Sequence, residues 1–100
     1  MFDKARYLTR GVNETVPLAV QVLLWRMVED AALRTPLDYL QVFRLTPATL
    51  DGKTAQEVVH EQEQPPYSVS FTFPFVNPLS ATLFIIDDGE HATMLFPQER

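Results

Sequence analysis

The sequence predicts an α+β fold, with one long helix packed on a mostly antiparallel five- to six-stranded sheet, in the order β-α-β-β-β-β-β. Three observations lead to this prediction. Residues 16–34 are the only long segment with helical periodicity, residues 67–73 alternate strictly between apolar and polar side chains, and residues 81–96 contain two apolar runs around an Asp-Gly pair. Of the 100 residues, 46% are hydrophobic and 21% are charged, so a single domain spanning residues 1–100 is expected.

The first strand is expected over residues 4–9, and the helix follows it. Residues 13–15 include Asn and Thr, whose side chains can accept hydrogen bonds from the free N–H groups at a helix start. Pro17 is tolerated in the first helical turn, where its missing N–H is not needed. Pro36 disfavours helical backbone at the residue before it, so the helix should end near Arg34.

The rest of the chain is expected to form strands. Residues 38–45 carry apolar side chains on both faces, which indicates a central strand, whereas the strongly polar residues 55–63 indicate an edge strand. Residues 67–73 should have one buried and one solvated face. The pair Asp88-Gly89 favours a two-residue type I′ turn between the last two strands.

Two apolar stripes run along the helical segment. The stripe that should face the core consists of Val16, Val20, Leu23, Leu24, Met27 and Ala31. The opposite stripe consists of Leu18, Val22, Trp25 and Ala32. A surface helix normally has one such stripe, and tryptophan is enriched at binding surfaces.

We therefore expect the second stripe to be an interface, either of a homodimer or with a heterologous protein partner. Another interpretation is that the segment around Phe2 or the connection at residues 74–78 covers this stripe within one chain.

One cluster of side chains could support chemistry, and it consists of Asp87, Asp88, Glu90 and His91. Such oxygen and nitrogen ligands can hold a divalent cation, but their spacing is not that of a calcium loop, and Asp and Gly are the residues that a tight turn demands. A structural role is favoured, so we assign no metal site and expect no cofactor.

No catalytic residue is assigned, because the chain has no cysteine, no glycine-rich phosphate loop and no serine in the turn that exposes a nucleophile. The favoured function is a noncatalytic protein-interaction module. The alternative is a divalent-cation-dependent hydrolase or nuclease that uses the acidic hairpin.

The net charge of −5 is concentrated in residues 51–100, which carry eight acidic and two basic side chains. Such a surface repels phosphate backbones, so nonspecific nucleic-acid binding is not expected. No signal peptide or membrane span is recognised, and cysteine is absent, so the expected location is the cytoplasm.

Three stretches carry a resemblance to a known family. They are LTRGVNETVP at residues 8–17, LDYLQVF at residues 37–43 and IDDGEHATML at residues 86–95. In their order and approximate spacing they resemble the small bacterial family catalogued as domain of unknown function 960. The resemblance implies a cytoplasmic protein of bacteria or their phages, and it implies no substrate, cofactor or catalytic residue.

Overall fold

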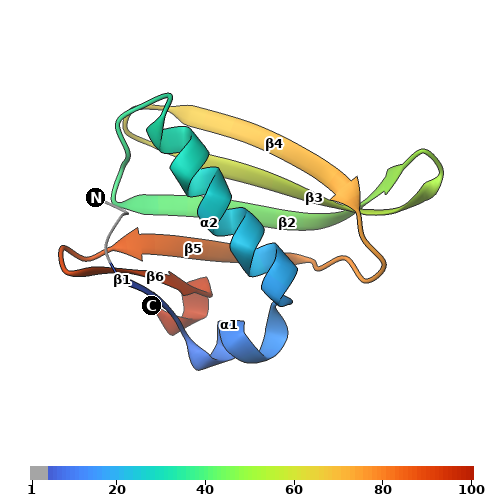
Figure 1. Cartoon of the computed structure of the whole chain (residues 1–100), viewed down its shortest axis with the longest axis horizontal. Coiled ribbons are helices and arrows are strands. Elements are labelled where there is room, and N and C mark those ends of the chain that lie inside the picture. The colour runs from blue at the N-terminus through green and yellow to red at the C-terminus, as the bar shows by residue number, and fades with distance from the viewer. Residues whose placement is uncertain (1–4) are drawn as a thin grey trace.

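The computed structural model describes residues 5–100 and contains two helices and a six-stranded sheet (Figure 1). The helices are α1 (Arg10–Thr15) and α2 (Leu18–Ala32). The strands are β1 (Ala5–Leu8), β2 (Leu40–Leu50), β3 (Lys53–Gln62), β4 (Tyr67–Pro74), β5 (Ala81–Asp87) and β6 (His91–Leu95), and a short 3-10 helix, η1 (Pro97–Glu99), follows them. The predicted strand residue Lys4 and the predicted cover around Phe2 lie outside the described residues.

The sheet has the strand order β1-β6-β5-β2-β3-β4. Strand β1 runs parallel to β6, and the other four neighbouring pairs are antiparallel. In Figure 1, α2 crosses one face of the sheet obliquely from the β5 side toward β4. The predicted α+β class and the central position of β2 are confirmed, and the sheet is mixed because of the β1–β6 pair.

The predicted long helix over residues 16–34 is confirmed only in part, because α2 is limited to Leu18–Ala32 and a separate helix, α1, precedes it at Arg10–Thr15. The Thr9 hydroxyl accepts a hydrogen bond from the Val12 N–H, so a helical turn already begins at Arg10. Pro17 then adopts an extended conformation with ψ 146° and separates α1 from α2. The local backbone thus starts a helix earlier and interrupts it at Pro17.

The core lies between α2 and the sheet face that it crosses. Helix α2 contributes Val20, Leu24, Met27 and Val28, the sheet contributes Phe43, Leu45, Val58, Leu83, Ile85, Ala92 and Met94, and α1 adds Val12. These side chains recur with the helical period in α2 and with the strand period of two in the sheet, as burial of one face requires. The hydrophobic effect therefore fixes which face of α2 meets the sheet.

The predicted edge position of residues 55–63 is wrong. Strand β3 lies between β2 and β4, and the edges of the sheet are β1 and β4. Three polar side chains of β3, those of Gln56, His60 and Gln62, are buried and hydrogen-bonded inside the protein. A polar strand can occupy the interior because its buried polar groups find partners there.

The two hairpins use different turns. In the β2–β3 hairpin, Leu50 pairs with Lys53, and Asp51 and Gly52 both have positive φ, as a type I′ turn requires. In the β5–β6 hairpin, Asp87 pairs with Ala92, and the Asp88 N–H donates to the His91 carbonyl, so Gly89 and Glu90 form the tip. The predicted tip at Asp88-Gly89 is therefore wrong by one residue.

Candidate functional site

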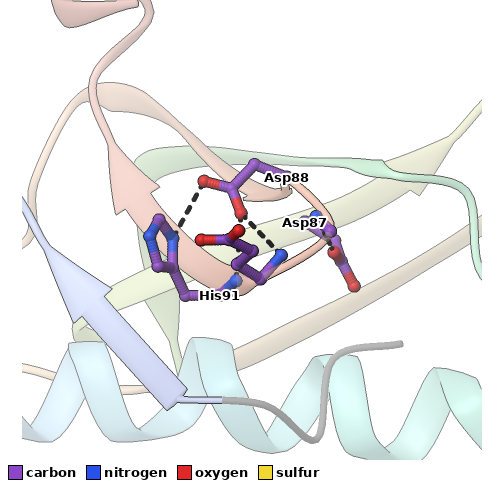
Figure 2. Close-up of polar contacts among 5 residues, drawn as sticks. Asp87, Asp88 and His91 are labelled. Atoms are coloured by element: carbon purple, nitrogen blue, oxygen red, sulfur yellow. Dashed lines mark hydrogen bonds and ion pairs between the residues drawn. The ribbon is translucent and has the colours of Figure 1, made fainter.

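In the acidic hairpin, the carboxylates of Asp87 and Asp88 accept hydrogen bonds from backbone N–H groups of the same hairpin (Figure 2). Asp88 Oδ1 accepts hydrogen bonds from the Glu90 N–H at 3.1 Å and the His91 N–H at 2.9 Å. Asp88 Oδ2 lies 2.8 Å from His91 Nδ1. Asp87 Oδ1 accepts from the Gly89 N–H at 2.8 Å.

These contacts explain the electrostatics of Asp88. The backbone N–H groups of His91 and Glu90 stabilise its carboxylate form, so the pKa of Asp88 lies below its ordinary value of 3.8. Across residues 5–100, no group of three or more His, Asp or Glu side chains is arranged to hold a metal ion. The geometry thus gives the predicted hydrolase or nuclease alternative no support.

Replacing Gly89 by alanine should destabilise the hairpin through the backbone alone. Gly89 has φ 100°, and a Cβ added there would meet no atom within 4 Å. We expect Gly89→Ala to lower the free energy of unfolding by about 1 to 2 kcal/mol, measured by urea denaturation, because the alanine must adopt a left-handed conformation. The neighbouring exposed variant Glu90→Ala is the control, and equal stability of both variants would contradict the assigned turn.

The four residues of the predicted interface stripe differ in exposure. Leu18 is 72% exposed, Val22 and Ala32 are also exposed, but Trp25 is only 9% exposed. The Arg6 guanidinium lies 4.9 Å from the centre of the Trp25 ring.

The Arg6 guanidinium also forms an ion pair at 2.8 Å with Glu29, which lies on α2 like Trp25. Strand β1 therefore supplies the cover of Trp25 within one chain, and a cation over an indole face is a favourable contact. That Leu18, Val22 and Ala32 form an interface stays a prediction.

A groove between α2 and β4 is the surface that the sequence did not predict. It has a volume of about 540 Å³ and is lined on the helix side by Leu23, Met27 and Leu33 and on the strand side by Val69 and Phe71. Leu33 is 85% exposed and Phe71 is 49% exposed. The alternation of β4 was visible in the sequence, but the predicted burial of one face is incomplete, since Val69 is also 38% exposed.

A chain of buried amides and one histidine connects β2, β3 and the segment that follows α2, and sequence reasoning also missed it. His60 Nε2 and Gln41 Oε1 are 2.6 Å apart, and Gln41 Nε2 donates to Gln62 Oε1 at 2.7 Å. Gln62 Nε2 in turn donates to the carbonyls of Pro36 and Pro65. Since Gln41 Nε2 is a donor, its Oε1 must accept, so His60 carries a proton on Nε2.

The buried location of His60 determines the protonation state of its ring. Its ring is fully buried and stacks on Phe43 with the ring centres 4.4 Å apart. Burial disfavours the charged imidazolium and lowers the pKa of His60 from 6.5 to about 4. The ring is thus held in the core by the stack on Phe43 and the hydrogen bond to Gln41.

The fold and these sites together define a small α+β protein in which Asp87 and Asp88 are engaged in a turn and His60 is buried in the core. The chain belongs to the family described as "Staphylococcal protein of unknown function (DUF960)", which it matches over residues 5–99. The resemblance of the three sequence stretches to this family is thereby confirmed.

A solved structure with the same fold is similar over nearly the whole chain. It is the crystal structure of a protein of unknown function from Enterococcus faecalis, with 27% sequence identity and a TM-score of 0.80, and the match covers 98% of this chain and 92% of that chain. No curated protein matches. Among the described helices, none has the length and apolar character needed to cross a membrane.

Proposed function

We propose that this protein is a noncatalytic, cytoplasmic protein-interaction module that associates with itself. The proposal is carried by the apolar side chains left exposed on two parts of the surface. Leu18 and Val22 lie on α2, whereas Leu33, directly after α2, and Phe71 of β4 line the groove. Contiguous exposed apolar surface is typical of protein-binding sites. The engagement of Asp87 and Asp88 by backbone N–H groups and the burial of His60 are consistent with a protein that performs no chemistry.

Two parts of the surface are candidates for self-association. One is the helix face with Leu18, Val22 and Ala32, which the sequence analysis proposed. The other is the groove between α2 and β4. Most soluble homo-oligomers are twofold dimers, so a dimer is the expected assembly for either surface.

The test is the absolute mass of the chain by light scattering over a wide range of concentrations. A mass that rises from 11.4 kDa to twice that value would support self-association. The variant Val22→Glu probes the helix face without disturbing the core, because Val22 is exposed. A native chain that stays monomeric at every concentration would contradict the proposal.

A further inference from the structure

The unpaired edge of β4 has a composition that is unusual for an exposed edge strand. Among the described residues, β4 pairs only with β3, and its sequence YSVSFTFP contains no charged side chain. Exposed edges are normally protected from pairing by charges, bulges or a covering segment. We propose that β4 pairs antiparallel with β4 of a second copy around Ser70, which joins the two sheets into one. The inference rests on the proposed self-association and specifies its surface.

The backbone of β4 presents the groups that such pairing needs. Phe75 N donates to the Thr54 carbonyl at 3.2 Å, which continues the β3–β4 register beyond Ala55 and Pro74. Hydrogen-bonded and non-hydrogen-bonded pairs alternate along an antiparallel ladder. The N–H and C=O groups that point away from β3 are therefore those of Ser68, Ser70 and Thr72.

A register with the twofold axis at Ser70 uses all of these groups. Ser70 then lies opposite Ser70 of the second copy, and Ser68 lies opposite Thr72 in both directions, which gives roughly six backbone hydrogen bonds. In the same register, Val69 lies opposite Phe71 of the second copy, in the closely spaced non-hydrogen-bonded positions. Pairs of a β-branched and an aromatic side chain are favourable there, so the strand is complementary to itself.

The side chains of Val69 and Phe71 also lie on the helix side of the sheet. Val69 pairs with His60 and Phe71 with Val58, and both of these β3 side chains are buried beneath α2. Val69 and Phe71 therefore point to the helix side of the sheet, and both line the groove between α2 and β4. Pairing of two β4 strands would join the two grooves and bury their exposed apolar side chains against each other.

The charges at this edge allow a second copy of the acidic chain to approach. The groove is lined by Arg26 together with Glu29 and Asp30, so the joined grooves would contain both signs of charge. The strand that would form the junction is neutral. Two molecules with a net charge of −5 can therefore meet at this edge without placing acidic side chains opposite each other.

The experiment compares two substitutions of Ser70 with the same substitutions of Ser80, an exposed serine in the connection between β4 and β5. Ser70→Lys would place two ammonium groups opposite each other at the twofold axis. We expect it to weaken the dimer by roughly tenfold or more in light scattering, while circular dichroism shows an unchanged fold. Ser80→Lys should leave the mass unchanged.

The cysteine substitutions identify the contact directly, because the native chain has no cysteine. Paired residues in a hydrogen-bonded position have Cα atoms about 5.5 Å apart, which a disulfide can bridge. We expect Ser70→Cys to form a covalent dimer on mild oxidation at low concentration, and Ser80→Cys to remain largely uncrosslinked.

The outcomes separate this inference from the proposed function. If native protein is a dimer that Ser70→Lys leaves intact and Ser70→Cys does not crosslink, the β4 pairing is overturned while self-association stands. Disruption of that dimer by Val22→Glu would assign it to the helix face. If the native chain is a monomer at all concentrations, both the proposed function and this pairing fail.

Discussion

Trp25→Ala is expected to lower the free energy of unfolding by about 3 to 5 kcal/mol. The indole is almost completely buried in the core cluster beside Leu24 and Val28, and its removal leaves a cavity under the Arg6 side chain. This is a large fraction of the stability of a small domain. The measurement is urea denaturation followed by far-ultraviolet circular dichroism, since the variant has no tryptophan.

The control for this prediction lies on the same helix. Val22→Ala removes an exposed apolar side chain and should change the stability by no more than about 0.5 kcal/mol. A Trp25→Ala variant that keeps its stability but changes from dimer to monomer would instead place Trp25 in an interface. That result would contradict the cover by Arg6 that the structure describes.

The stability of the protein is expected to fall by about 2 kcal/mol between pH 7 and pH 5 because of His60. The pKa of His60 is about 4 in the folded chain and near 6.5 when it is exposed, so in this range the unfolded chain binds a proton that the folded chain does not. Stability is therefore fully present above pH 6.5 and decreases as the pH falls toward 4.

Urea denaturation at several pH values checks this expectation. His60→Gln loses the stack on Phe43 and is less stable at pH 7, but its stability should change little between pH 7 and pH 5. His91→Gln removes the other histidine and should retain the dependence. Backbone N–H groups lower the pKa values of Asp88 and Glu99, so their contributions are lost only below the ordinary carboxyl range. An equal pH dependence in native protein and His60→Gln would contradict the assignment.

The limits of the sequence prediction are clearest at the two Asp-Gly pairs. Asp51-Gly52 forms the type I′ turn that this pair favours, whereas Asp88-Gly89 does not. The Asp88 carboxylate accepts two backbone N–H groups and shifts the tip of the hairpin toward Glu90. An Asp-Gly pair thus marks a turn at both places, but side-chain hydrogen bonds decide the register of the second.

Strand β3 shows why the position of a strand in the sheet was harder to predict. Its polar residues were interpreted as solvated, although Gln56 and His60 bind partners from other segments in the core. Those partners are distant in the sequence, at Leu79 and Gln41, so no local pattern could reveal them. The same reasoning applies to Trp25, whose cover comes from a different element.

The prediction of an interface on the helix was limited in the same way, because contacts from distant segments are not visible in local sequence. The helical period placed Leu18, Val22 and Trp25 on one stripe. Leu18 and Val22 are exposed, but the period could not show that β1 reaches Trp25. The groove beside β4 is lined by side chains from two segments that are far apart in the sequence, so it depends on tertiary packing. Periodicity predicts which residues share a face, and the tertiary arrangement decides whether that face is covered.

The parallel pairing of β1 with β6 has a consequence for the order in which the chain can fold. Among the described strands, β1 pairs only with β6. The Thr9 hydroxyl donates to Glu99, 90 residues further along the chain. During synthesis, β1, which carries Arg6, has no strand partner until β6 has left the ribosome. Closure of so long a loop is entropically costly, so the cover of Trp25 depends on a contact that can form only after β6 has been synthesised.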